Sequence, residues 1–398
     1  MSILDRPLTL PPGFRAAGVH CGIKAKKVDL ALVFSQLPAS AAGMFTQITT
    51  RAAPVIINEQ KLKSGRAQAV IINSGNANAC TGKRGFVDAR AMSLAAASAL
   101  GISEDLVLAT STGVIGWPLP IDRIVAATPT LVSRLGPGSM PAARAIMTTD
   151  AFPKAATLAV AIGKGQAMIA GIAKGAGMIH PDMATMIAVL TTDAAIQPEM
   201  LKQALRTAVD ETFNGISVDG DTSTSDSVFV LANGASELAS IDRPGKRYDA
   251  FVAGLTDVAG DLARMIVQDG EGAERLVEVG VRGALSDSDA RLAGRTVMTS
   301  VLVKTAFHGA ELNWGRISAA VGRSGAVVEP DRLSISIGDV EVVRRGVGVP
   351  DAYARARPLL EQPEVCVTIK LGLGRGTFTG WTSDLGVNYV KLNSGYLT

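Results

Sequence analysis

Short runs of β-branched residues and leucine, interrupted every few positions by glycine, proline or a charged residue, dominate the chain. Runs of this kind, bounded by turn residues, are typical of buried strands. We expect a pair of strands within 156–172, turning at Gly163-Lys164-Gly165. The other strands are expected at 28–34, 54–57, 69–72, 107–110, 186–190 and 228–231.

Apolar positions spaced by the 3.6-residue period predict helices. The pattern is clearest in 198–213, with apolar residues at Met200, Leu201, Leu205, Val209 and Phe213. Further helices are expected at 89–100, with Asp88 near its start, at 142–147 and at 250–267. The last of these is the longest.

The bulk composition suits a large interior of small aliphatic residues. The 398 residues are 47% hydrophobic and only 4% aromatic, and they include 42 glycines. This favours an α/β or α+β interior with many tight turns and two or three domains. The composition turns polar near 284–294, and we predict a domain boundary there, with a smaller C-terminal domain at about 285–398.

Charge and cysteine content exclude several classes of protein. The net charge is only +3 and the 39 basic residues are scattered, so nucleic-acid binding has little support. Three distant cysteines and three histidines without paired spacing predict neither a disulfide framework nor a metal site. The start of the chain has no signal-peptide pattern, and no long uncharged apolar stretch is present. We therefore expect a cytoplasmic protein.

The segment 174–186 carries the first candidate chemistry, Lys-Gly-Ala-Gly-Met-Ile-His-Pro-Asp-Met-Ala-Thr-Met. A threonine hydroxyl is a poor nucleophile unless a base lies within hydrogen-bonding reach. Cleavage of the Ala184–Thr185 bond would create an α-amino group on Thr185, with a reference pKa of about 7.7–8.0, that could be this base. The alternative from the residues alone is that Thr185 simply begins a buried strand.

Three further short motifs are ambiguous on their own. Ser111-Thr112-Gly113 ends a predicted strand and could form an oxyanion hole, or it could be a turn. Glu271, between two glycines, could present a carboxylate to a cleft or belong to an ordinary turn. Lys174 could bind a substrate carboxylate or lie in solvent.

Two loops, one rich in aspartate and one rich in glycine, suggest a cation site and a dinucleotide-binding site, but their residue patterns support neither. The aspartates of 219–226 lack the ligand spacing of an EF-hand, so a hydrogen-bonded loop is favoured over a cation site. The stretch 371–376 resembles a dinucleotide-binding loop but lacks the helix and the distant acidic residue, so a glycine-rich hairpin is favoured.

The 174–186 motif resembles the self-cleavage segment of the ornithine acetyltransferase family, also called glutamate N-acetyltransferases. Matching motifs include Asn-Ser-Gly-Asn-Ala-Asn at 73–78, Asp-Gly-Asp-Thr-Ser-Thr at 219–224 and Asn-Trp-Gly-Arg at 313–316, so the resemblance spans nearly the whole chain. It implies an α+β fold with stacked layers of sheet and helix, of the ornithine acetyltransferase/aminopeptidase type, and a smaller α/β C-terminal domain.

The resemblance also implies roles for individual residues. Cleavage would give an α piece, 1–184, and a β piece, 185–398, that begins with the nucleophile Thr185. Thr112 and Gly113 would form the oxyanion hole. The implied substrate-binding residues are Lys174, Thr185, Glu271, Asn393 and Thr398.

At two positions the chain departs from the family pattern. Ala151 stands where family members usually carry a substrate-contacting hydroxyl, and Asp182 stands where asparagine is more common. Ala151 removes one expected polar contact, which leaves the substrate open. Asp182 adds a carboxylate three residues before the predicted cleavage site.

The reaction implied by the resemblance is transfer of the acetyl group of N-acetylornithine to glutamate through an acyl-enzyme, in arginine biosynthesis. No cofactor is expected, although some family members also use acetyl-CoA as donor. The partners would be small amino-acid substrates, with two α and two β chains in the assembly. Two alternatives remain open: a paralogue with another acyl donor or acceptor, and an N-terminal-nucleophile amidase or aminopeptidase.

Overall fold

The computed structural model describes residues 8–180 and 186–395. Ala184, Thr185, Asp182 and Thr398 lie outside the described residues. The chain forms two compact units. The first holds the described residues up to Asn214 and the segment Asp221–Ile266, and the second holds Gly215–Gly220 and the described residues from Val267 onward.

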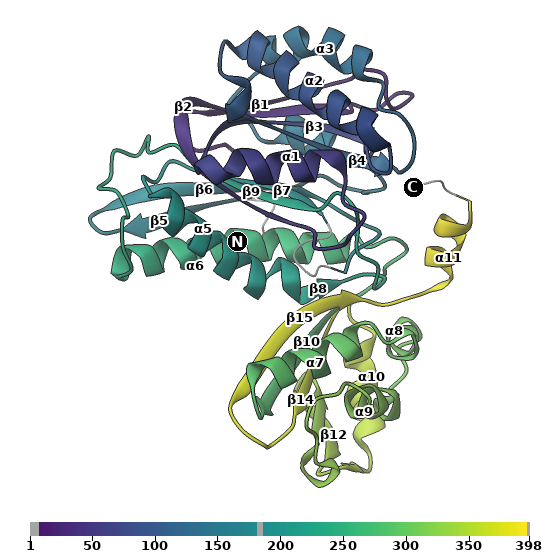
Figure 1. The fold of residues 1–398 in the computed structure, drawn as a ribbon. Coiled ribbons are helices and arrows are strands. Elements are labelled where there is room, and N and C mark those ends of the chain that lie inside the picture. Colours follow the sequence, from purple (N-terminus) through teal and green to yellow (C-terminus); the bar gives the residue numbers. More distant parts are fainter. Residues whose placement is uncertain (1–7, 181–185, 396–398) are drawn as a thin grey trace. The chain divides into compact units, whose positions relative to one another are not determined.

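The first unit is built on a mixed sheet of eight strands in the described residues (Figure 1). Its strand order is β4-β3-β2-β9-β7-β6-β5, and β1 pairs with β2 outside this path. The strands are β1 (Phe14–Val19), β2 (Leu30–Phe45), β3 (Arg66–Asn76), β4 (Val107–Val114), β5 (Lys154–Ile162), β6 (Gly165–Lys174), β7 (Ile187–Thr192) and β9 (Ser227–Ala232).

The sheet folds into two halves because β2 is long and shifts register between Phe34 and Ala39. Its first part pairs with β1 and β3, and its last part pairs with β9. One apolar cluster contains buried residues from both halves, including Val33 and Val189, so the halves pack face to face. The helices of this unit are α1 (Ala53–Lys61), α2 (Gly82–Leu100), α3 (Ile121–Ser133), α4 (Met140–Ala145), α5 (Pro198–Glu211) and α6 (Lys246–Gln268).

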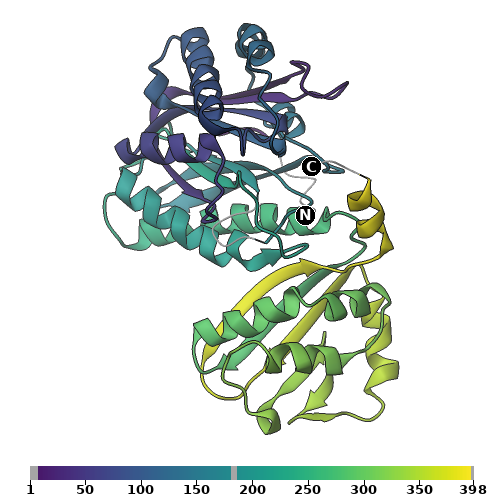
Figure 2. The ribbon, with the colours of Figure 1, turned by 45° about the vertical axis from the view of Figure 1, so that its right-hand side comes forward.

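Helices cover the outer faces of both halves (Figure 2). Helices α2 and α3 pack with β1, β3 and β4 around Met92 and Ile124. Helix α6 lies against β6 so closely that a Cβ on Gly171 would come within 2.7 Å of the Leu262 side chain. The result is a layered α+β arrangement, which confirms the expected fold class.

In the first unit most of the predicted elements are present, and one predicted strand is a helix. The apolar residues predicted for 198–213 are all buried, and the residues up to 211 form α5. The run 54–57, predicted as a strand, is instead the start of helix α1, with Pro54 in its first turn. Proline suits that position because its fixed φ is already helical and its missing N–H has no partner to lose.

The second unit has its own sheet, in the order β13-β12-β11-β14-β10-β15-β8. Its strands are β8 (Ile216–Ser217), β10 (Leu276–Ala284), β11 (Ser334–Ile337), β12 (Val340–Arg344), β13 (Val347–Gly348), β14 (Glu364–Lys370) and β15 (Gly376–Ser383). Its helices are α7 (Asp287–Met298), α8 (Val301–His308), α9 (Trp314–Gly322), α10 (Ala352–Leu360) and α11 (Val387–Ser394).

Two details of this unit differ from the sequence expectation. It begins at Val267, earlier than the polar stretch near residue 285, because β10 lies inside its sheet, between β14 and β15. The stretch 371–376 is not a hairpin, since the strands on either side of it, β14 and β15, both pair with β10 rather than with each other. Among the described helices, none combines the length and the apolar character that a membrane span needs.

Candidate active site

The end of strand β4 has a backbone shape that only glycine allows. Strands β3 and β4 run parallel, and their register shifts between Gly75 and Asn76. Gly113 has φ +130°, and a Cβ there would lie 2.4 Å from the carbonyl carbon of Gly75. The backbone approach is therefore too close for any side chain at position 113.

The asparagine-rich loop after β3 fixes this approach. Asn76 accepts a hydrogen bond from the backbone N–H of Asn78 and donates to the carbonyls of Trp117 and Pro118, beyond β4. Asn78 in turn donates to the carbonyl of Gly85. These side-chain-to-backbone bonds hold the ends of β3 and β4 together, so the loop supports the shape of the Gly113 backbone.

Lys174 lies beside the predicted oxyanion hole. It ends strand β6, is only 8% exposed, and its Nζ donates to Thr112 Oγ1 at 3.3 Å. The structure thus brings Lys174 to the neighbouring residues Thr112 and Gly113, from which it is far apart in the sequence and with which the family resemblance had marked it.

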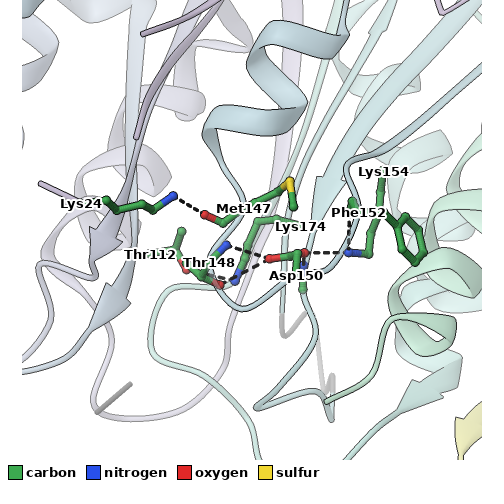
Figure 3. A network of polar contacts seen from close by, with 9 residues as sticks. Lys24, Thr112, Met147, Thr148, Asp150, Phe152, Lys154 and Lys174 are labelled. Carbon is green, nitrogen blue, oxygen red and sulfur yellow. Dashed lines mark hydrogen bonds and ion pairs between the residues drawn. The ribbon is translucent and has the colours of Figure 1, made fainter. Parts of the chain in front are cut away.

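A buried carboxylate lies at the centre of a network around Lys174 (Figure 3). Asp150 accepts from Lys154 Nζ at 2.7 Å, from the Gly175 backbone N–H at 2.8 Å and from the Thr148 backbone N–H at 2.8 Å. Burial would raise its pKa, but the charges of Lys174 and Lys154 outweigh burial and hold the pKa of Asp150 well below its usual range. Asp150 is therefore ionised and carries the negative charge among these buried lysines.

A third lysine joins this network from the segment after β1. Lys24 Nζ donates to the Met147 carbonyl at 2.5 Å and to the Val28 carbonyl at 3.2 Å. Burial, with the nearby charge of Lys174 acting in the same direction, lowers the pKa of Lys24 to about 8. Asp29, which accepts from the Lys24 backbone N–H at 2.8 Å, is a second carboxylate beside Lys24, so three lysines and the two carboxylates Asp29 and Asp150 meet in this part of the unit.

The second unit brings together the other predicted pair. Glu271 follows α6 and accepts from Asn393 Nδ2, on α11, at 2.8 Å. The turn that carries Glu271 is tightly packed against α11, because a Cβ on Gly272 would lie 2.4 Å from the backbone nitrogen of Tyr389. The Glu271 carboxylate is half-buried and held by this contact.

A buried cluster in the same unit was missed by the sequence analysis. Asp384 accepts from the Glu274 and Arg275 backbone N–H groups, and its Oδ2 lies 2.7 Å from His308 Nδ1. Lys304 is buried beside it, and burial lowers the pKa of Lys304 to about 7. Since these donors already occupy the carboxylate, the cluster serves to anchor the segment that leads into α11. Residues this far apart in the sequence gave no local signal.

The remaining predicted site residues are placed as follows. Ala151 is exposed and directly follows Asp150. Thr185, Ala184 and Thr398 lie outside the described residues, so their roles stay predictions. Asp150 and Lys154 were not among the predicted site residues, because a spacing of four residues predicts a charged pair on a helix and these residues lie in a turn and at the start of β5.

Comparison with known proteins identifies the family. The ArgJ family model matches residues 15–398. The chain belongs to the ArgJ family. The Arginine biosynthesis bifunctional protein ArgJ of Geobacter sulfurreducens is 48% identical over 97% of this chain and 99% of its own length. The ornithine acetyltransferase family indicated by the sequence motifs is thereby confirmed.

Two solved structures are also similar to this chain. A crystal structure of Arginine biosynthesis bifunctional protein ArgJ from Bacillus halodurans is 39% identical, with a TM-score of 0.50, and covers 52% of this chain and 97% of its own. A structure of ornithine acetyltransferase from Mycobacterium tuberculosis, in complex with ornithine, is 45% identical, with a TM-score of 0.43. It covers 45% of this chain and 96% of its own.

Proposed function

We propose that this ArgJ-family chain cleaves itself between Ala184 and Thr185 and then transfers the acetyl group of N-acetylornithine to glutamate. Membership of the family makes it an acyltransferase of arginine biosynthesis. The observation that carries the detailed proposal is the hydrogen bond from Lys174 to Thr112, next to Gly113, whose positive φ only glycine adopts readily. This hydrogen bond places the Lys174 cation beside the two predicted oxyanion donors, Thr112 and Gly113.

The half-length match to the solved Bacillus halodurans chain supports cleavage. That chain is covered almost completely by about half of this one, whereas the Geobacter sulfurreducens relative is covered along its full length. A precursor of full length that separates into two pieces of similar size accounts for both matches.

In the proposed reaction, the hydroxyl of Thr185 attacks the acetyl carbonyl carbon while its α-amine takes up the hydroxyl proton. The negative charge that forms on the acetyl oxygen is stabilised by the Thr112 hydroxyl and the Gly113 N–H. The carbon–nitrogen bond to ornithine then breaks, and the α-ammonium returns the proton to the leaving nitrogen. An acetyl ester on Thr185 remains.

Glutamate completes the cycle. Its neutral α-amine attacks the ester carbonyl and gives a proton to the α-amine of Thr185. The ester carbon–oxygen bond then breaks, and the resulting α-ammonium returns that proton to the threonine oxygen, which restores the hydroxyl. The same donors stabilise the second oxyanion. Lys174 is a cation beside the predicted oxyanion donors, which fits substrates that carry an α-carboxylate.

The test of this proposal is release of ornithine from N-acetylornithine by the purified wild-type protein, with and without glutamate. We expect release to depend on glutamate and N-acetylglutamate to form in equal amount, because transfer requires the acyl-enzyme to outlast attack by water. Equal release without glutamate would instead indicate the amidase alternative. No release under either condition would favour a different acyl donor or acceptor, for which Ala151 is the feature to change first.

Replacement of Gly113 by alanine should lower kcat by about 10²–10³, the loss typical of one oxyanion donor. The reason is that an ideal Cβ at position 113 would lie 2.4 Å from the carbonyl carbon of Gly75, so the backbone at the predicted oxyanion hole must move. The measurement is kcat for glutamate-dependent ornithine release. The matched control is Gly116→Ala, where φ is also positive, at +86°, but no atom lies within 4 Å of the new Cβ. Similar losses in both variants would argue against a special role of Gly113.

The proposal also covers the location, the assembly and the small-molecule partners of the enzyme. We place the enzyme in the cytoplasm, with two α and two β pieces in each assembly. Ornithine and glutamate would be its small-molecule partners, and it would need no cofactor. Acetyl-CoA is a possible second donor, and a direct assay with acetyl-CoA and glutamate distinguishes the two cases.

A further inference from the structure

Helix α11, which carries Asn393, adds nothing to the core of the second unit. None of its residues, Val387–Ser394, is buried. A helix this short is marginal in water unless tertiary contacts support it. The place of α11 in the second unit therefore depends on the segment that leads into it and on the few contacts that its side chains make.

Asp384, three residues before α11, anchors that segment. The residue is 2% exposed, and its Oδ1 accepts from the backbone N–H groups of Glu274 and Arg275 at 2.8 and 2.9 Å. Its own backbone N–H donates to the Arg275 carbonyl at 3.2 Å. Both the side chain and the backbone of Asp384 are thus bonded to residues that follow Glu271 by three and four positions.

The other carboxylate oxygen of Asp384 is held by His308, at the end of α8. The distance from Oδ2 to His308 Nδ1 is 2.7 Å, and since a carboxylate can only accept, the ring donates. Gly386 lies against the same ring, so closely that a Cβ there would come within 2.3 Å of His308 Cε1. Arg275 Nη1 donates to the His308 carbonyl at 2.8 Å. These contacts fix the segment 384–386 against α8.

Asp384 and the Glu271–Asn393 contact close a ring of interactions. On one side, Glu271 lies three residues before Glu274, whose N–H is bonded to Asp384. On the other side, Asp384 leads into α11, where Asn393 Nδ2 donates to Glu271 Oε2 at 2.8 Å. One buried side chain therefore fixes both the turn that carries Glu271 and the helix that carries Asn393.

We propose that Asp384 is a positioning residue for substrate binding, which holds Glu271 and Asn393 together so that both can bind the amine of one substrate. The inference rests on the proposed function and on the substrate-binding roles predicted for these two residues. Glu271 is half-buried and Asn393 is exposed, so a ligand can reach both. Glu271 Oε1 and Asn393 Oδ1 are oxygens that can accept from an ammonium. N-acetylornithine carries such a group on its side chain.

The test is the rate of acetyl transfer by Asp384→Asn, with N-acetylornithine varied and glutamate saturating. The amide oxygen can still accept from the two backbone N–H groups, but the amide nitrogen replaces the acceptor that His308 needs. We expect KM for N-acetylornithine to rise about tenfold and kcat to stay within about twofold, because a contact common to ground and transition state is loosened. A fall in kcat at unchanged KM, or no change in either, overturns the inference.

A double-mutant cycle separates positioning from a general loss of structure. Glu271→Gln removes the charge through which Asp384 is proposed to act. Asp384→Asn should therefore raise KM by less than about twofold when Glu271→Gln is already present, because residues that act through one another are not additive. Equal factors in the wild-type and Glu271→Gln backgrounds overturn the inference, since independent effects multiply.

The matched control is Asp339→Asn, an exposed aspartate between β11 and β12 of the same unit, which should leave KM and kcat unchanged. An equal rise in KM for this control overturns the inference. A wild-type protein that releases no ornithine removes the proposed function, and this inference with it. An active wild type beside an unchanged Asp384→Asn variant overturns the inference alone.

A second variant keeps the inference testable if Asp384→Asn fails to fold, since the charge of Asp384 also acts on the buried Lys304. His308→Phe keeps a ring beside Gly386 and removes the donor to Asp384. It should raise KM for N-acetylornithine about threefold at unchanged kcat, because Asp384 keeps its bonds to Glu274 and Arg275. A wild-type KM in this variant overturns the inference.

Discussion

Thr185→Ala should give a single uncut chain and lower the rate of acetyl transfer by at least about 10⁴-fold. Removal of the nucleophile from a group of residues that act together typically costs this much or more. Without the hydroxyl, neither the peptide bond before residue 185 nor the substrate amide can be attacked. Intact mass of purified wild type and variant, beside the ornithine-release assay, measures both effects in one preparation.

Thr185→Ser is the matched control, because serine supplies the same hydroxyl and, after cleavage, the same α-amine. It should restore cleavage and a measurable part of the transfer rate. The mechanism would be wrong if Thr185→Ala were cut at the same bond as wild type. A wild-type chain that stays uncut but transfers acetyl groups would remove the amine base from the mechanism and leave the reaction itself in place.

Asp150→Asn should destabilise the protein by about 3–5 kcal/mol, the usual cost of leaving a buried charge without its partner. Lys154 is fully buried and lies 2.7 Å from the Asp150 carboxylate, and the positive charge of Lys174 also acts to lower the pKa of Asp150. We expect transfer to weaken too, because the orientation of Lys174 toward Thr112 would change. Urea unfolding at pH 7 measures the loss of stability.

The pH dependence of this effect follows from the sign of the shift. The folded-state pKa of Asp150 lies well below the unfolded value of about 3.9. Its contribution to stability is therefore fully present above about pH 4 and is lost as the pH falls through the lower folded-state pKa. The difference between wild type and Asp150→Asn should be constant near neutral pH and shrink in acid.

Asp122→Asn is the control for this experiment, because Asp122 is an exposed aspartate at the start of α3. Its substitution should change the free energy of unfolding by no more than about 0.5 kcal/mol. Equal urea midpoints for Asp150→Asn and wild type would show that the buried ion pair adds nothing to stability. If the difference in free energy of unfolding between wild type and Asp150→Asn grew as the pH fell, the assigned direction of the Asp150 pKa shift would be wrong.

The local patterns of the sequence were sufficient for most of the elements that surround the site. The helical period of 198–213 and the predicted strand pair around the turn at 163–165 appear in the structure as α5 and as the β5–β6 pair. The run 54–57 was misread because four apolar residues fit a buried strand and a buried helix equally well. Only its packing as part of α1 distinguishes the two.

The sequence by itself determined the family, because the segment 174–186 and the matching motifs spread along the chain carry the resemblance. The short motifs at Thr112 and Glu271 are ambiguous on their own and gained their candidate roles through that resemblance. The tertiary structure decided which of these residues meet. Lys174 reaches Thr112 across 62 positions of sequence, and Asp150 gathers its partners from a turn and the ends of β5 and β6. Burial and strand register depend on the whole sheet, so no local pattern of residues encodes them.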